Sequence, residues 1–399
     1  TQLATFALIM QARADDANLF DQSIQTNIVQ IVASNHLDAQ AVFTNLAEKS
    51  NFITFGEVRQ FIDSFTNADL FGSLIQISPN TLEIAHKLES FIDGQSQQHN
   101  DLLQTDDLEQ LRPLIQQTKL LAQTYACVVA NPPYMGSKGY NAELKKLIEI
   151  NYKDAKADLF ACFIQRGFNF AKPQAYNAMV TMQSWMFLSS FEAFRQQTLT
   201  QHNLEKMLHM ANNVMGIAFQ TVATVFQNHK SSDFIGHYCY VDYEDLDSNK
   251  IPSYFPIKNE RLGYNAQGKF AKLPGSPIAY WVSDKVADIF ATYPPLSEFA
   301  DARQGLATAD NNRFLRLWHE VDYHNIGLDM ANREQAQQSG LKWFPYNKGG
   351  EFRKWYGNQE HIVNYKHDGD SVRKYRVSVG QSQSLPGSQY YFREGVTWS

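Results

Sequence analysis

One short motif, Asn131-Pro132-Pro133-Tyr134, has residue types that suit chemistry on an amino group. An exocyclic amine on a planar ring or amide is a poor nucleophile, because its lone pair is delocalised. The amide oxygen of Asn131 and the backbone carbonyl of Pro132 can each accept one N–H of such an amine, and these bonds aim its lone pair at an electrophile. Pro132 and Pro133 stiffen the loop, and Tyr134 offers a face for ring stacking, worth roughly 1–3 kcal/mol per base. The simpler alternative is a turn that only ends a strand. We favour a functional site, because the four-residue motif is rarer than a diproline turn.

The motif directly follows a predicted strand, Tyr125–Ala130, whose run of apolar residues is typical of a buried parallel strand. The strand must end at Asn131, because two prolines cannot continue a central strand. In open α/β sheets, ligands bind at the carboxyl ends of the strands. The sequence therefore predicts a binding site at this strand end.

The pattern of apolar residues predicts further elements on either side of this strand. Helices are expected at 1–12, about 22–47, about 79–93, about 106–123, 142–150, 155–170 and 189–200. Strands are expected at 176–182, 204–210, 221–227 and 234–242, the last two forming an antiparallel pair across a polar turn. Alternation of strands and helices predicts an α/β fold with a largely parallel sheet over residues 1–250. Residues 251–285, rich in Pro, Gly and Asn, are expected to be a connector, and 286–399 a mixed region with a helix at 284–292.

Length and composition exclude several classes of protein. The chain has 399 residues, of which 44% are hydrophobic and 19% charged, which suggests two or three folded domains. Its apolar runs fall short of the ~18 residues that a membrane helix needs, and no signal peptide is recognisable. Three cysteines without paired spacing fit a reducing cytoplasm and small buried apolar side chains. The histidines show no metal-ligand spacing, so no metal site is expected.

Both ends of the sequence suggest a piece of a larger protein. The chain begins with Thr1, and an apolar stripe of Leu3, Phe6, Ala7 and Met10 predicts a helix whose core face starts almost at once. The last ten residues are aromatic and strand-like, without a polar tail. The alternative, equally open on the sequence alone, is an engineered or processed terminus.

The charge is distributed unevenly along the chain. Residues 1–250 carry a net charge of −9, whereas residues 251–399 carry +3. Basic side chains alternate with aromatic ones over residues 342–376, a composition that suits a polyanion with exposed bases. The alternative is a solvated basic face over a small aromatic core.

The motif and its surroundings resemble the amino-group methyltransferases that use S-adenosylmethionine (SAM), above all the N6-adenine DNA methyltransferases. Segments 158–160, 178–185, 191–195 and 214–227 match that family in order. The longer strings NPPYMGSKGYN (131–141), ATADNNRF (307–314) and WFPYNKGGEFRKWYGN (343–358) are most similar to the PglX-type methyltransferases of bacterial BREX phage-defence systems.

The resemblance implies a Rossmann-like SAM-dependent catalytic domain at 1–250, extra helices included, and a partial target-recognition domain of mixed α+β structure at 286–399. It implies that double-stranded DNA is the partner, with other phage-defence proteins as further partners in a bacterial cytoplasm. Tyr134 and Phe219 would stack on a flipped adenine. The residues implied at the SAM site are Asp69, Leu70, Phe71, Asn131 and Phe160. Candidate contacts to DNA are Asn311, Arg313, Lys348, Arg353 and Lys354.

The sequence departs from the family at one point: it has no Gly-x-Gly turn between an early strand and helix. By the family's order, this SAM-binding loop is expected upstream of residue 1. Two alternatives therefore stay open beside a DNA adenine methyltransferase. One is a catalytically silent subunit for DNA recognition or assembly, and the other is a protein-glutamine N-methyltransferase, which uses the same motif.

Overall fold

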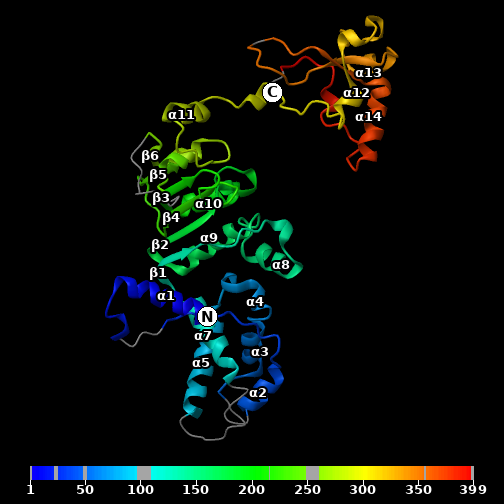
Figure 1. Cartoon of the computed structure of the whole chain (residues 1–399). Helices are drawn as coiled ribbons and strands as arrows, with labels where there is room; N and C mark the ends of the chain where they lie inside the picture. The colour runs from blue at the N-terminus through cyan, green and yellow to red at the C-terminus, as the bar shows by residue number, and fades with distance from the viewer. Residues whose placement is uncertain are drawn as a thin grey trace. The chain divides into compact units, whose positions relative to one another are not determined.

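The computed structural model describes residues 2–21, 26–47, 52–96, 109–214, 216–248, 260–354 and 356–396. The chain forms two compact units, Thr1–Tyr293 and Pro294–Ser399. The first is α/β with a mixed six-stranded sheet, and the second combines a three-stranded sheet with short helices (Figure 1).

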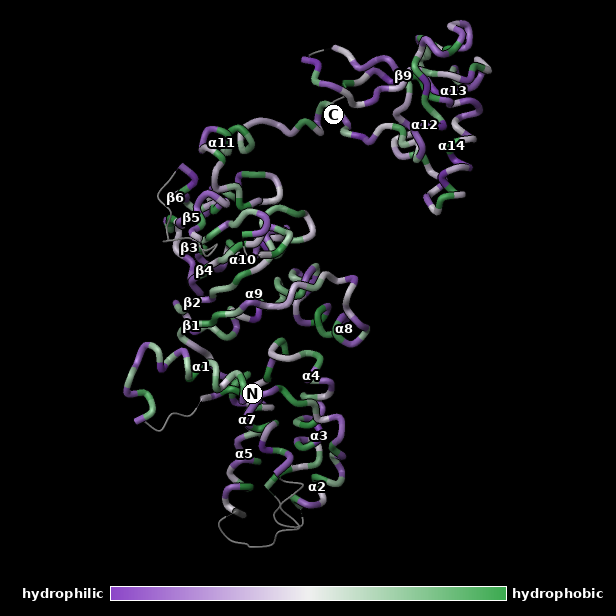
Figure 2. Tube along the Cα trace, in the orientation of Figure 1, coloured by the Kyte–Doolittle hydropathy of each residue, from purple (hydrophilic) through white to green (hydrophobic). Residues whose placement is uncertain are grey.

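The N-terminal part of the first unit is helical. Its helices are α1 (Gln2–Asp15), α2 (Ala39–Ala47), α3 (Phe55–Asp63), α4 (Ala68–Phe71), α5 (Pro79–Ser96) and α7 (Leu111–Ala122). Helices α2 to α7 share a core that includes Phe61, Phe65 and Leu88. In contrast, α1 buries none of its side chains, and Leu3 is 82% exposed. The expectation that its apolar stripe is a core face is therefore wrong in this structure; Figure 2 shows hydrophobic residues along this exposed helix.

The helix expected over about 22–47 is confined to α2. Residues 22–25 lie outside the described residues, and 26–38 contain no helix. The buried side chain of Gln117 explains part of this difference, because it accepts from the backbone N–H of Val32 (2.9 Å) and donates to the Val32 carbonyl (3.1 Å). These bonds replace the ones a helix would provide. Similarly, the helix expected from about 106 is described only as α7, and residues 106–108 lie outside the described part.

The six strands of the main sheet are β1 (Tyr125–Ala130), β2 (Ala171–Met182), β3 (Asn203–Met210), β4 (Thr221–Gln227), β5 (Ile235–Val241) and β6 (Leu262–Ala266). Their order is β1-β2-β4-β3-β5-β6. Only the β1/β2 and β3/β5 pairs are parallel, so the sheet is mixed rather than largely parallel. Strands β4 and β5 do not pair as expected, because β3 lies between them.

Two further expectations about this sheet need correction. Strand β1 lies at its edge and is not buried: Val129 is 75% exposed, and Cys127 is exposed while Cys162 and Cys239 are buried. Residues 251–285 are not simply a connector, because β6 pairs with β5 and residues up to Tyr293 belong to the first unit. Residues 251–259 lie outside the described part of the chain.

Helices pack against the main sheet and complete its core. They are α8 (Ala142–Asn151), α9 (Leu159–Phe170) and α10 (Glu192–Gln201). Helix α11 (Asp284–Thr292) lies at the expected position, but it packs on the 3-10 segment Gln267–Lys272 and not on this core. The largest buried side chains of this core include Trp185, Phe160 and Phe226. Helix α9 leads into β2 and packs on it, so the chain from β1 through α9 to β2 forms a parallel βαβ unit.

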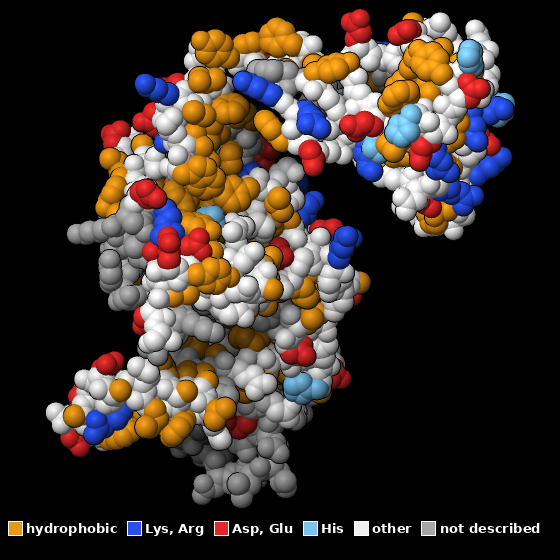
Figure 3. Space-filling view, turned by 45° about the horizontal axis from the view of Figure 1, so that its top comes forward, with side chains coloured by type: hydrophobic (Ala, Val, Ile, Leu, Met, Phe, Trp, Pro, Cys, Tyr) orange, Lys and Arg blue, Asp and Glu red, His pale blue; other side chains and the backbone are white. Residues whose placement is uncertain are grey.

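The second unit has a small sheet in the order β7-β9-β8. Its elements are α12 (Asn311–Phe314), β7 (Leu315–Leu317), α13 (Arg333–Gln338), β8 (Trp343–Tyr346), β9 (His361–Asn364) and α14 (Lys366–Ser378). Phe314, Phe344 and Tyr365 lie in its core. The described residues 390–396, expected to be strand-like, form no strand, and Tyr390 ends a 3-10 turn (Ser388–Tyr390). Figure 3 shows several Lys and Arg side chains on this unit.

Two kinds of feature are absent from the described residues. None of the described helices is both long and apolar enough to cross a membrane. Within the same ranges, no group of three or more His, Cys, Asp or Glu side chains could hold a metal ion.

Candidate active site

The Asn-Pro-Pro-Tyr loop follows β1 directly. It therefore lies along the carboxyl-terminal edge of the sheet, which is the side where the parallel strands end. Asn131 and Pro133 are exposed, Pro132 is buried, and Tyr134 is half-buried. The phenol of Tyr134 donates to Oδ1 of Asn131 (3.0 Å) and also lies 3.1 Å from the carbonyl oxygen of Val180 on β2. Partial burial raises the pKa of Tyr134 above its ordinary value, so the group stays a neutral donor. The loop thus presents a polar acceptor beside an aromatic ring.

Asp158 fastens this loop to the start of α9. Its Oδ1 accepts from the backbone N–H of Met135 (3.0 Å) and of Phe160 (3.3 Å), so one carboxylate caps the helix and holds the loop. The N–H of Leu159 donates to the carbonyl of Met135 (3.0 Å), and Gly136 forms a backbone bridge with Asp158. Burial raises the pKa of Asp158, although the backbone donors oppose that shift. The conformation of the loop therefore depends on residues about 25 positions later.

The structure brings Phe219 to the Asn-Pro-Pro-Tyr loop. Its ring centroid lies 5.8 Å from that of Tyr134, and the two ring planes meet at 70°. This edge-to-face arrangement differs from two parallel faces around a base, so stacking on both sides of a base requires one ring to turn. Phe219 lies two residues before β4, whose first residue, Thr221, pairs with Met182 at the end of β2. Because β4 runs antiparallel to β2, it begins beside the end of β2, and this places Phe219 near the loop that follows β1.

Behind Tyr134, Phe160 has no exposed surface. Its ring lies edge-on to Tyr134 (6.2 Å) and stacks on Phe191 (5.6 Å). Phe160 was expected at the SAM site, but its ring supports Tyr134 rather than lining open space.

The segment Asp69-Leu70-Phe71 lies on α4, next to α8. Asp69 and Leu70 are exposed, whereas Phe71 packs between the two large cores. The segment that follows is tied to α9 by the buried guanidinium of Arg166. This group donates to the carbonyl oxygens of Ser73 (2.9 Å), Ile75 (2.8 Å) and Leu121 (2.9 Å). Helix α9 therefore positions both the Asn-Pro-Pro-Tyr loop, at its start, and the segment after α4, along its length.

A chain of amide side chains lies behind Phe219. The side chain of Gln183, which follows β2, donates to that of Gln220, and its own oxygen pairs with the buried imidazole of His209 (2.5 Å). The backbone N–H of Gln183 also donates to the carbonyl of Gln220 (3.3 Å). These contacts fix the backbone directly after Phe219.

The five candidate DNA contacts fall into two groups within the second unit. Asn311 and Arg313 lie on α12, directly before β7, and Arg313 lies over the ring of Tyr375 (4.8 Å). Lys348, Arg353 and Lys354 lie in the exposed loop between β8 and β9. The strand registers set these groups at opposite ends of the small sheet, because the end of β7 and the end of β8 both pair with His361 at the start of β9. The structure therefore does not gather them into one patch.

Sequence reasoning assigned no positioning role to four side chains that hold this site, although three of them lie in segments matched to the family: Asp158, Gln183 and Gln220 in those segments, and Arg166 outside them. A signal existed for Asp158, since an Asp before an apolar helix is a typical N-cap. The other three carry no local signal, because their partners are backbone or amide groups distant in sequence.

Residues 1–215 match the family model described as Eco57I restriction-modification methylase. Over the whole chain, the sequence is 36% identical to the adenine-specific methyltransferase BrxX of Escherichia coli O9:H4 (strain HS) and 32% identical to the adenine-specific methyltransferase PglX of Lacticaseibacillus casei (strain Zhang). The chain spans about a third (34%) of the length of each of these relatives.

Solved structures of restriction-modification proteins are also similar at a low level. One is a nuclease-deletion mutant of the Type ISP enzyme LlaGI in complex with a DNA substrate mimic. It shares 13% identity, covers 74% of this chain and 32% of its own, and has a TM-score of 0.34, which is too low to support a structural argument.

Proposed function

Because this chain belongs to the Eco57I restriction-modification methylase family, we propose that it is the catalytic part of a DNA methyltransferase that transfers a methyl group to N6 of adenine. The relatives named adenine-specific methyltransferases support this substrate. The observation that carries the proposal is the group formed by Asn131, Tyr134 and Phe219 at the carboxyl edge of the sheet. A polar acceptor beside two aromatic rings is what recognition of an aromatic amine requires.

In this proposal, the target adenine leaves the duplex at a cost of a few kcal/mol and enters the space beside Tyr134. Oδ1 of Asn131 already accepts one bond from Tyr134, and its second lone pair accepts an N–H of the adenine amine. The Pro132 carbonyl accepts the other N–H. Phe219 turns from its edge-on position so that its face meets the base. Positioning and charge complementarity supply most of the catalytic effect.

The residues present fit part of SAM, which when bound supplies an electrophilic methyl group. The exposed carboxylate of Asp69 suits ribose hydroxyls, and the exposed side chain of Leu70 suits the face of the adenosine ring. Phe71 supports both from behind. Asn131 would border the cofactor and the substrate amine together.

The second unit is proposed to contact double-stranded DNA through Arg313 and through the loop with Lys348, Arg353 and Lys354. We propose that the whole protein acts in phage defence of the BREX type, with other defence proteins, in a bacterial cytoplasm. Charge reversal at Arg353 and Lys354 should weaken duplex binding and flatten its dependence on salt, because fewer counterions are released.

The direct test is methylation of duplex DNA by the whole protein with SAM labelled on its methyl group. Asn131→Ala removes the side-chain acceptor and should abolish incorporation into DNA. Asn151→Ala, an exposed residue at the end of α8, is the matched control and should leave incorporation unchanged.

Activity near the wild-type level in Asn131→Ala would refute the assignment. Two other outcomes identify the alternatives. DNA binding without incorporation by the wild type indicates a silent recognition or assembly subunit. Label on a protein glutamine, with none on DNA, indicates a glutamine methyltransferase.

A further inference from the structure

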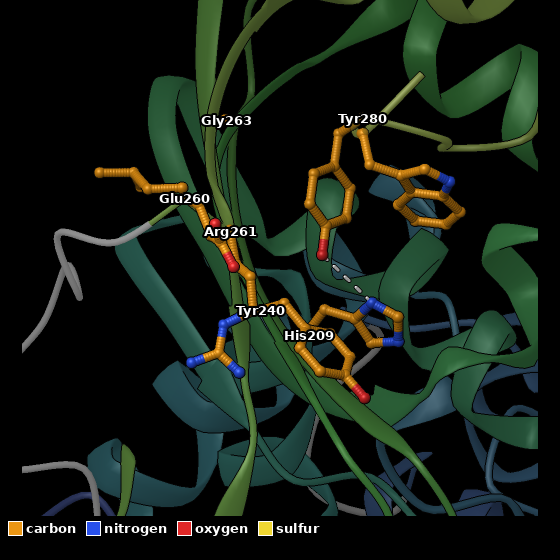
Figure 4. Close-up of a pocket in the computed structure, with 8 residues that line it drawn as sticks. His209, Tyr240, Glu260, Arg261, Gly263 and Tyr280 are labelled. Atoms are coloured by element: carbon orange, nitrogen blue, oxygen red, sulfur yellow. Dashed lines mark hydrogen bonds between the residues drawn. The ribbon is translucent and has the colours of Figure 1, made fainter. Parts of the chain in front are cut away.

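A second pocket opens at the same edge of the main sheet as the catalytic loop. It has a volume of about 370 Å³ and is lined by His209, Tyr240, Glu260, Arg261, Leu262, Gly263, Tyr280 and Trp281 (Figure 4). This volume is at the lower end of the range for small-molecule pockets. His209 is the second-to-last residue of β3, and Tyr240 is the second-to-last residue of β5. Because these strands run parallel to β1 and β2, their ends lie along the edge that carries Asn131.

The inner wall of this pocket is aromatic and neutral. The imidazole of His209 meets the ring of Tyr240 edge-on (5.0 Å), and its Nδ1 lies 3.3 Å from the phenol oxygen of Tyr280. Burial lowers the pKa of His209 to about 4, so the imidazole is uncharged at neutral pH. Trp281 is 59% exposed, and its ring lies at 81° to that of Tyr280, with centroids 5.0 Å apart. The two rings form a corner, and the ring of Phe187 lies 5.7 Å from that of Trp281 at a tilt of 54°.

The basic side chain of the pocket does not offer a free positive charge to a ligand. Arg261 is paired with Glu244 (3.0 Å) and Asp245 (2.8 Å). Figure 4 shows the guanidinium of Arg261 and the side chain of Glu260 pointing away from Tyr280 and His209. A phosphate would therefore meet compensated or negative charge, whereas a neutral planar ring would meet aromatic faces.

The pocket is linked to the catalytic loop through the amide side chains already described. Tyr240 hydrogen-bonds to the side chain of Gln220, and His209 bonds to Gln183. Gln220 directly follows Phe219, whose ring contacts Tyr134. A strand of nucleic acid held at the catalytic loop thus has a second aromatic recess next to it on the same edge.

We propose that this pocket binds a second nucleobase of the DNA, one that lies near the methylated adenine and stacks on Trp281. The proposal rests on the proposed function for the identity of the DNA substrate. The hydroxyl and imidazole groups of the pocket already bond to one another or to Gln183 and Gln220, so recognition is by stacking and shape and tolerates different bases. Loss of one stacked base should weaken binding by roughly 5-fold to 150-fold.

The test is photo-cross-linking of the whole protein to single-stranded oligodeoxynucleotides that carry 5-iodouracil, with the linked residue identified by mass spectrometry. Cross-links are expected at Trp281 or Tyr240. Trp281→Ala should abolish the cross-link at that position and weaken oligonucleotide binding at least about 5-fold, and Trp281→Phe should restore part of the binding. Phe290→Ala, an exposed aromatic of α11 outside the pocket, is the control and should leave both unchanged.

The readout does not depend on methylation, so this site and the proposed function can fail separately. Asn131→Ala should keep the cross-link at the pocket. Cross-links that map only elsewhere in the chain, or oligonucleotide binding unaffected by Trp281→Ala, would overturn the proposal. Binding of an arginine-rich peptide at Trp281, without binding of DNA there, would also overturn the proposal and would identify a protein partner.

Discussion

Removal of the Asp158 carboxylate is expected to loosen the attachment of the Asn-Pro-Pro-Tyr loop to α9. In Asp158→Ala, the backbone N–H groups of Met135 and Phe160 lose their acceptor in a place where the side chain is only 9% exposed. Asp158→Asn keeps one acceptor oxygen in nearly the same shape, removes the charge and replaces the other carboxylate oxygen with an NH2 group. The two variants therefore separate the hydrogen bonds from the ionisation of the group.

The magnitude follows from these two bonds. Hydrogen bonds to a charged group contribute about 1.5–3 kcal/mol each, and the 3.3 Å bond to Phe160 counts at the low end. Burial of the carboxylate, which raises its pKa, offsets part of this gain. We expect Asp158→Ala to lower the free energy of unfolding of the first unit by about 2–3 kcal/mol and Asp158→Asn by about 1 kcal/mol.

Hydrogen exchange of backbone amides, followed by mass spectrometry, reads out the loop itself. Peptides covering residues 131–140 should exchange faster in Asp158→Ala than in Asp158→Asn, with denaturant unfolding measured alongside. Asp154→Ala, an exposed carboxylate four residues earlier, is the control. If Asp158→Ala leaves exchange of Met135 unchanged and costs under about 0.5 kcal/mol, the reasoning about the loop is wrong.

Three further predictions concern the first unit. Gly236→Ala would put a β-carbon 2.4 Å from a backbone oxygen of β3, so it should lower the free energy of unfolding by about 1–3 kcal/mol in denaturant unfolding. Gly268→Ala meets nothing within 4 Å and should change the free energy of unfolding by under about 0.5 kcal/mol. Equal effects of the two variants would contradict the packing described for Gly236. Burial lowers the pKa of His202 and His209 from 6.5 to about 4, so the stability that they contribute is complete above pH 6.5 and is lost as pH falls toward 4. His209→Gln should therefore make the unfolding midpoint depend less on pH between 6.5 and 4. A midpoint that depends on pH as in the wild type would contradict this assignment. Arg166→Met leaves three buried carbonyl oxygens without their donor and should lower the free energy of unfolding by about 3–5 kcal/mol. Arg166→Lys should restore only part of this stability, because one ammonium cannot reach all three oxygens. Thermal melting measures both variants, and full rescue by Lys would show that charge alone suffices.

The sequence allowed prediction of features that depend on local pattern. The strand at Tyr125–Ala130, the helix at 142–150 and the strand at 204–210 follow from apolar periodicity and were found close to their expected bounds. The meeting of Phe219 with Tyr134 was expected from the family resemblance and not from the residues, and the structure brings the two rings into contact.

Other features depend on partners distant in the sequence and could not be predicted. Strand β4 lies between β2 and β3, and this order depends on pairing across the whole sheet. The prediction that β4 and β5 pair, made because they are neighbours in the sequence, was therefore wrong. Residues 26–38 lack a helix although their pattern allows one, partly because Gln117 supplies bonds to Val32 from 85 positions away. The positioning bonds of Arg166 also join distant segments, and no local pattern signals them.

The antiparallel entry of β4 has a consequence for how this protein reaches its working form. Tyr134 and Phe219 are 85 positions apart and meet only when β4 has paired with both β2 and β3. Contacts of such high sequence separation form late, because the closure of the intervening chain must come first. During synthesis, the βαβ part from β1 to β2 can fold before β4 has left the ribosome. The aromatic pair is therefore completed only after residue 227 has emerged, so a nascent chain acquires its scaffold before it acquires its site.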